Sequence, residues 1–172
     1  GTLSPGYLDN LLEAGVNRLS IGVQSFAKPE LALLGRIHSP SQAVDAIESA
    51  RKAGFANLSL DLMFGIPGQN LASWQANLEK AIELKLEHLS LYSLILEPGT
   101  QLFDDVQAGR LQPASEDLSA DMYEFAMDAL GQEGFSHYEI SNWAKGEFFE
   151  SRHNKIYWKN QPYLGVGVGA HS

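Results

Sequence analysis

Polar side chains interrupt three apolar, strand-like segments of the sequence. They are Gln24 in "AGVNRLSIGVQSF", Asp61 in "AGFANLSLDLMFG" and Ser93 in "LKLEHLSLYSLILEPG". An amide, a carboxylate and a hydroxyl can together bind the polar groups of a small ligand. For any one of these residues, a hydrogen bond to a neighbouring helix cap is an equally good explanation. Because all three lie in or at the ends of equivalent segments, each near a turn, we favour a ligand site.

These three segments form an internal repeat, and the repeat predicts the fold. Each has a Leu-Ser pair, an apolar run and a turn, and the first two follow an Ala-Gly pair that suits a helix C-terminus. Amphipathic segments lie between them, at a spacing of about 30 to 40 residues that fits a βα unit. The sequence therefore predicts a parallel sheet with both faces buried, either in a barrel or in an open doubly wound sheet. In both, ligands bind beyond the carboxyl ends of the strands.

The pattern changes after residue 100. A loop-rich connector with a short helix around Phe103 to Gly109 comes first, followed by a strong amphipathic helix in "SEDLSADMYEFAMDALGQEGF". The segment "SHYEISNWAK" is predicted to be one strand, and "SRHNKIYWKN" a basic and aromatic loop before a Gly-rich strand or turn. Nothing between these segments looks like a linker.

Composition excludes several classes of function. The 172 residues carry a formal net charge of −9, which argues against a nucleic-acid-binding surface. The absence of cysteine excludes disulfides and thiolate metal sites within this sequence. No apolar run is long enough to span a membrane and no signal peptide opens the sequence, so we expect a cytoplasmic protein. Because the sequence starts at Gly1, we expect it to be a piece of a longer protein.

An ordered set of motifs carries a family resemblance. The set is "RLSIGVQSF", "LLGRIH", "LDLMFGIPGQ", "LSLYSLILEPGT", "HYEISNWA", "SRHNKIYW" and "PYLGVGVGAHS". Together they resemble the HemW-type heme chaperones of the radical S-adenosylmethionine (SAM) superfamily, which are relatives of the oxygen-independent coproporphyrinogen III oxidase. The resemblance implies an α/β fold, a partial (β/α) barrel with a C-terminal α+β extension. Residues 1–100 would form the C-terminal part of the barrel, and residues 101–172 the barrel end and the start of the extension.

The resemblance also implies cofactors. In the superfamily, a Cys-x3-Cys-x2-Cys loop binds a four-iron four-sulfur cluster, and the cluster reduces and cleaves SAM. Since this sequence has no cysteine, we expect the cluster ligands to lie upstream of Gly1. The partners implied are heme, SAM and a heme-acceptor protein, with no nucleic acid.

Five positions match SAM-contacting positions of the oxidase branch, and none is assigned a catalytic role. They are Gln24, Arg36, Asp61, Ile95 and His171. An arginine suits the SAM carboxylate and an aspartate suits ribose hydroxyls or the ammonium group, whereas an amide both donates and accepts. At position 171 the oxidase has an apolar residue instead of histidine.

Heme is expected at "SRHNKIYW". His153 is the predicted axial ligand, Tyr157 and Trp158 offer flat apolar surface, and cations for the propionates are available at Arg152, Lys155 and Lys159. His171 and His137 are competing ligands. The alternative is a surface loop in which the histidine caps the next turn and the aromatic rings pack on the barrel end.

Other functions remain open from the sequence. Glu139, Ser141 and Asn142 replace a pattern typical of the oxidase, which favours heme transfer over coproporphyrinogen III oxidation. A cofactor-free interaction fragment is a further alternative. An aldolase-like barrel is weaker, because no strand presents a lysine at its end.

Overall fold

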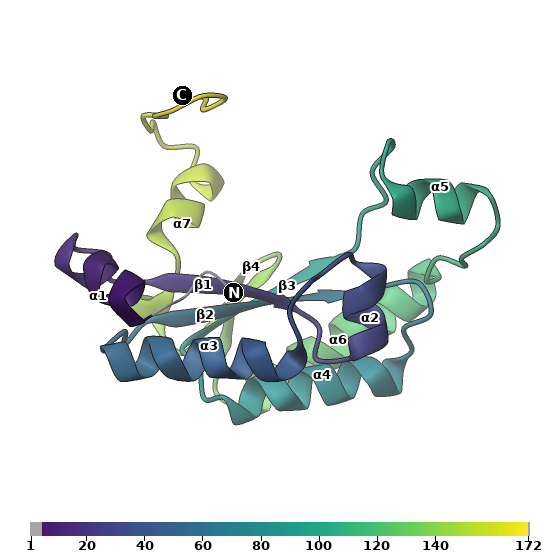
Figure 1. Ribbon diagram of the computed structural model, residues 1–172, viewed down its shortest axis with the longest axis horizontal. Helices are drawn as coiled ribbons and strands as arrows, with labels where there is room; N and C mark the ends of the chain where they lie inside the picture. Colours follow the sequence, from purple (N-terminus) through teal and green to yellow (C-terminus); the bar gives the residue numbers. More distant parts are fainter. Residues whose placement is uncertain (1–4, 172) are drawn as a thin grey trace.

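A single mixed sheet organises the computed structural model, which describes residues 5–171 (Figure 1). The strand order is β1-β2-β3-β5-β4; β1, β2 and β3 are parallel, and β5 is antiparallel to both β3 and β4. The elements in chain order are α1 (Pro5–Glu13), β1 (Leu19–Gln24), α2 (Lys28–Leu33), α3 (Pro40–Ala53), β2 (Leu58–Phe64), α4 (Leu71–Glu83), β3 (His88–Ser93), α5 (Gln101–Gln107), α6 (Glu116–Gln132), β4 (Ser136–Glu139), β5 (Asn142–Ala144), a 3-10 turn (Glu147–Phe149) and α7 (Arg152–Trp158).

Helices α3, α4 and α6 cover one face of the sheet (Figure 1). Side chains of a strand point alternately to its two faces, and every second side chain of β2 enters the core under these helices. These side chains are fully or almost fully buried: Leu58, Leu60, Leu62 and Phe64. Trp74 of α4 packs on Phe64 and donates its indole N–H to the Met122 carbonyl at 2.7 Å. The contact joins α4 and α6 to the central strand.

The boundaries of α3 and α4 follow ordinary capping chemistry. Ser39 and Gln42 form a reciprocal capping box at the start of α3, and Gly54 ends that helix with a φ of 110°. Asn70 caps α4 by accepting a hydrogen bond from the Ser73 amide. These caps fix where each βα unit turns back toward the next strand.

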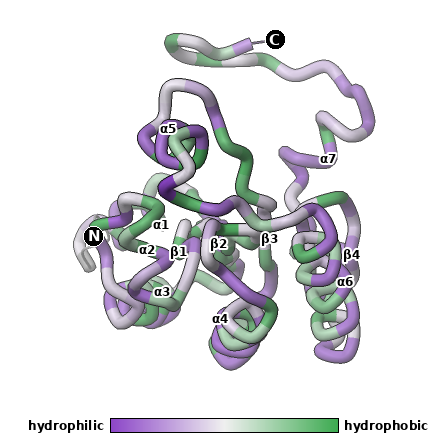
Figure 2. Tube along the Cα trace, turned by 90° about the vertical axis from the view of Figure 1, so that its right-hand side faces the viewer, coloured by the Kyte–Doolittle hydropathy of each residue, from purple (hydrophilic) through white to green (hydrophobic). Residues whose placement is uncertain are grey.

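The opposite face of the sheet, here called the inner face, is polar. Ser20, Asp61, Ser90 and Tyr92 lie on it by strand register and alternation, and α5 and α7 project from this side (Figures 1 and 2). The prediction that both faces would be buried is wrong for the described residues, because Ser20 and Tyr92 are exposed. Only the helix-covered face is apolar.

The second half differs from the sequence prediction in three places. The predicted short helix is α5, two residues earlier than expected, and the predicted single strand is the β4–β5 hairpin. The predicted basic loop is helix α7, capped by Ser151, whose hydroxyl accepts from the Asn154 amide. The Gly-rich segment after Gln161 has no regular structure. Since β5 pairs with β3, the sheet continues past residue 100.

Within residues 5–171, no helix combines the length and the apolar character required to cross a membrane.

Candidate functional site

The end of β1 brings Gln24 back over the inner face. Gln24 has a φ of 69°, which is rare for a residue with a side chain, and the β1–β2 register shifts between Gly22 and Gln24. A Cβ atom added to Gly22 would lie 2.8 Å from the Gln24 side-chain nitrogen and 3.9 Å from Asp61 Oδ2. The missing side chain of Gly22 therefore leaves the space in which the amide and the carboxylate approach each other.

Asp61 presents one free oxygen at this place. Its Oδ1 accepts a hydrogen bond from the Ser20 hydroxyl at 2.7 Å, whereas its Oδ2 accepts none from the described residues. Asp61 is partly buried and pairs in register with Gly22 on β1 and Ser90 on β3. A half-buried carboxylate oxygen without a protein donor can bind a donor or a cation of a ligand.

Arg36 and Ile95 lie on segments that follow the carboxyl ends of the strands. Arg36 is exposed just after α2 and makes no ion pair with the described residues. Ile95 is 72% exposed in the segment after β3. The carboxyl edge of the sheet is thus where Gln24 and Ile95 emerge, as expected for parallel strands.

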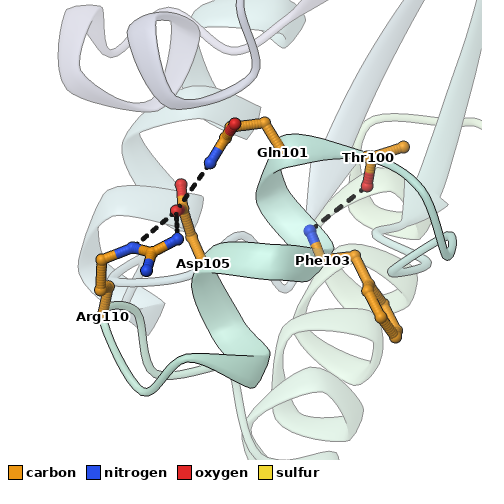
Figure 3. Close-up of polar contacts among 5 residues, drawn as sticks. All are labelled: Thr100, Gln101, Phe103, Asp105 and Arg110. Carbon is orange, nitrogen blue, oxygen red and sulfur yellow. Dashed lines mark hydrogen bonds and ion pairs between the residues drawn. The ribbon is translucent and has the colours of Figure 1, made fainter.

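Helix α5 follows Ile95 and projects from the sheet (Figure 1). Thr100 caps it by accepting from the Phe103 amide, and Arg110 donates twice to Asp105, at 2.8 and 2.5 Å (Figure 3). Hydrogen bonds, first from Arg110 and then from Gln101, hold the pKa of Asp105 below its ordinary value. These contacts all lie within residues 100–110, so they stabilise the α5 segment itself and do not connect it to the sheet.

His171 lies apart from the other SAM candidates. It is exposed at the end of a segment that extends away from the sheet beyond α7 in both views (Figures 1 and 2). No hydrogen bond or ring contact among the described residues joins it to Gln24 or Asp61. Its role at SAM stays a prediction.

Helix α7 carries the three heme candidates together. His153 Nε2 lies 3.0 Å from the Tyr157 hydroxyl, one helical turn on, and their rings meet edge to face at 4.9 Å. Tyr157 and Trp158 are 48% and 57% exposed, so neither ring is packed away against the sheet. Lys155 is paired with Glu150 at 2.6 Å, which leaves the other two basic residues of this region as the freer cations.

The competing heme ligand His137 is engaged in packing. Its ring stacks on Trp143 with a centroid distance of 4.3 Å and an interplanar angle of 11°. Its Nε2 lies 3.1 Å from the Ile140 carbonyl and 3.2 Å from the Tyr123 hydroxyl. These contacts fit a structural histidine that closes the β4–β5 hairpin on α6.

Sequence reasoning missed a buried histidine on the inner face. His88 Nδ1 lies 2.7 Å from the Ser59 hydroxyl and its Nε2 lies 2.8 Å from the Tyr138 hydroxyl, which accepts the Ser151 amide at 3.1 Å. Burial first, and the charge of Arg18 second, lower the pKa of His88 to about 3. The neutral ring connects β2, β3 and β4 to the start of α7. Its place beside the Leu-Ser pair was the available signal.

A second group was also missed. Glu30 on α2 is almost fully buried. Its carboxylate accepts hydrogen bonds from side chains of the turn after β1, the turn after β2 and α4. The signal was Asn77, a polar residue on the apolar stripe of α4 beside Trp74 and Leu78.

The βα units of the first half coincide with a match to a known family. Residues 1–81 match the family described as "Radical SAM superfamily". A solved structure titled "Coproporphyrinogen III oxidase (HemN) from Escherichia coli is a Radical SAM enzyme" superposes with a TM-score of 0.79 at 23% identity, over 98% of this chain and 41% of that one. That likeness shows the fold alone. Residues 1–81 therefore carry a radical SAM domain.

Among curated proteins the chain is similar to heme chaperones. It is 45% identical to "Heme chaperone HemW" of Lactococcus lactis subsp. lactis over 99% of this chain and 45% of that protein. It is 47% identical to "Heme chaperone HemW" of Bacillus subtilis over 98% of this chain and 44% of that protein. The chain therefore spans less than half the length of these relatives.

Proposed function

We propose that the chain forms part of a cytoplasmic heme chaperone of the HemW type, which binds SAM at the carboxyl edge of the sheet and heme on α7 and delivers the heme to an acceptor protein. Residues 1–100 would supply the C-terminal part of a barrel, and residues 101–172 its end and the start of an extension. The similarity to two heme chaperones over 98–99% of this chain supports the assignment.

The residues at the carboxyl edge fit SAM. Asp61 Oδ2, which has no donor among the described residues, offers an acceptor. The side-chain amide of Gln24 can both donate and accept, and Gly22 leaves the space between the two groups open. Arg36 forms no ion pair within residues 5–171 and could bind a carboxylate, and Ile95 has an exposed apolar side chain for an adenine ring. His171 stays a candidate. Bound SAM would supply a sulfonium centre that reductive cleavage can break.

The cluster does not fit this part of the protein. The sequence has no cysteine, and no group of histidine or acidic residues among the described ones could hold a metal ion. No step of the proposed function is routed through a cluster held by these residues.

Helix α7 is the observation that carries heme binding. One short helix exposes a histidine and two aromatic rings, with Arg152 and Lys159 beside them in a chain of net charge −9. Flat aromatic surface, an imidazole and cations are the groups that a porphyrin with propionates requires. Because Tyr157 and Trp158 keep about half of their surface in water, a planar ligand could bury apolar area there.

The Soret band of the heme-loaded full-length protein tests this proposal. Histidine-to-alanine variants at positions 153, 171 and 137 would be compared with the wild type. We expect H153A to shift the band and lower the heme stoichiometry, and H137A to leave both unchanged. A wild-type spectrum in H153A contradicts the assignment, and a shifted band in H171A alone would transfer the role to His171. Conversion of coproporphyrinogen III by the wild type would instead favour an oxidase.

A further inference from the structure

We infer that Glu30 is the positioning residue of the SAM site, a buried carboxylate that holds the turns after β1 and β2 where Gln24 and Asp61 can reach one ligand. This inference rests on the proposed binding of SAM at the carboxyl edge. Glu30 lies in the first turn of α2 and is only 7% exposed. A carboxylate this deeply buried is stable only where hydrogen bonds replace its hydration.

Four side chains donate to this one carboxylate. Its Oε2 accepts from the Ser25 hydroxyl at 2.6 Å, from the Gln69 amide at 3.0 Å and from the Asn77 amide at 3.1 Å. Its Oε1 accepts from the hydroxyl of Ser73. The donors come from the turn after β1, the turn after β2 and the first half of α4, so Glu30 joins three segments that are far apart in sequence.

The connection to Gln24 is direct. Ser25 follows Gln24 in the chain, and its hydroxyl also accepts a hydrogen bond from the backbone N–H of Ala27 at 2.8 Å. The backbone N–H of Phe26, between these two residues, donates to Asn77 Oδ1 at 2.5 Å. The turn after β1 is therefore fixed immediately beyond the residue that adopts the left-handed conformation. These contacts fix the turn next to Gln24, whose φ is 69°.

The connection to the second strand runs through Gln69. Its side-chain Nε2 donates to Glu30, and its side-chain Oε1 accepts from the backbone N–H of Ile66 at 3.4 Å. The backbone N–H of Gln69 donates to the Ile66 carbonyl at 2.8 Å. The Gly65–Gln69 turn that ends the Asp61 strand is thereby fastened to α2. Arg36 follows the same helix, so one carboxylate supports the segments of three SAM candidates.

A titration of SAM into the full-length protein by calorimetry tests the inference, with E30A, E30Q and I47A compared with the wild type. Ile47 is a core residue of α3 outside this network, and I47A serves as a control for general destabilisation. We expect E30A to lose about tenfold or more in SAM affinity, as is typical when a residue that orients ligand-binding groups is removed. We expect I47A to lose none at a similar fall in melting temperature.

The variant E30Q tests whether SAM binding depends on the hydrogen bonds of Glu30 or only on its negative charge. In E30Q the amide oxygen can accept the three donors at the Oε2 position, while the amide nitrogen donates to Ser73. We therefore expect E30Q to bind SAM within about threefold of the wild type. If E30A does not fold, the double variant E30Q/S73A replaces it, since it leaves that nitrogen without an acceptor; it should lose at least about fivefold, while S73A alone stays near the wild type.

The outcomes distinguish this inference from the function on which it rests. Wild-type affinity in E30A, or in E30Q/S73A if E30A does not fold, overturns the inference alone, provided that D61A is weakened. An equal loss in E30A and I47A also overturns it, because the effect would then be general. A wild-type protein that binds no SAM overturns the proposed site and the inference together.

Discussion

Asp61 shares its two carboxylate oxygens between the protein and, as we propose, a ligand. Because Oδ1 is held by Ser20 and Oδ2 has no donor among residues 5–171, the side chain is oriented before the ligand arrives. We predict that D61A and R36A each weaken SAM binding by about 1.5 to 3 kcal/mol, roughly ten- to a hundredfold, without unfolding the protein. Calorimetry on the reconstituted full-length protein measures this, and unchanged affinity in both variants would remove the site from this edge.

Gly22 allows a separate test at the residue scale. In G22A the new methyl group is too close only to the flexible end of Gln24 and lies at ordinary contact distance from Asp61, so the fold should persist while the Gln24 amide is displaced. Loss of one such hydrogen-bonding group corresponds to about 0.5 to 1.5 kcal/mol, or about two- to tenfold weaker SAM binding. G131A is the matched control, since nothing lies within 4 Å of a Cβ at that position. Equal affinities of G22A and G131A would contradict the prediction.

At the scale of elements, His88 joins three strands to α7, and its burial favours the neutral ring. Its pKa is about 3 in the folded chain and about 6.5 when unfolded, so the unfolded state binds the extra proton between these values. Stability is therefore complete above about pH 6.5 and falls as the pH drops toward 3. We predict a loss of about 2 kcal/mol between about pH 7 and pH 5 from this residue alone.

Comparison with H88Q isolates this contribution. A glutamine can bind the hydroxyls of Ser59 and Tyr138 without titrating in this range. Urea unfolding of both proteins at the two pH values should show the wild type losing more stability than H88Q on acidification. Parallel losses in the two proteins would mean that His88 is not the titrating group.

At the scale of the whole molecule, the sheet has an open side and an open edge. The outer edge of β1 is unpaired within the described residues and borders a groove of about 470 Å³ lined by Ile37 and α3. Contrary to the prediction from sequence, the uncovered face beside it is polar. Exposed apolar side chains elsewhere include Ile37, which is 96% exposed, and Val166 in the segment after α7, which is 86% exposed.

We predict that the 172-residue chain alone self-associates through this edge and these side chains. Light scattering after size exclusion should detect oligomers, and a hydrophobic dye should bind them. I37K, at an exposed position that costs no packing, should reduce the association. A monomer that melts sharply and cooperatively would contradict this prediction.

The sequence by itself determined the local structure of the first half. Repeated Leu-Ser segments, Ala-Gly stops and amphipathic patterns sufficed for β1, β2 and β3 and for α3 and α4 between them, because strand alternation, helix periodicity and capping depend on neighbours in the chain. The short helix α2 was not predicted. The acid in the middle of β2 and the amide at the end of β1 were recognisable as site candidates for the same reason: each breaks an apolar pattern.

Tertiary structure alone decided what those residues can reach. That Gln24 folds over Gly22 toward Asp61, that Glu30 gathers four donors and that His88 stays neutral all depend on side chains brought together from distant positions. The polar inner face was likewise hidden in the sequence, because serines between leucines fit a buried strand as well as an open face. Local pattern specifies which way a side chain points, whereas burial and partners follow from which elements pack there.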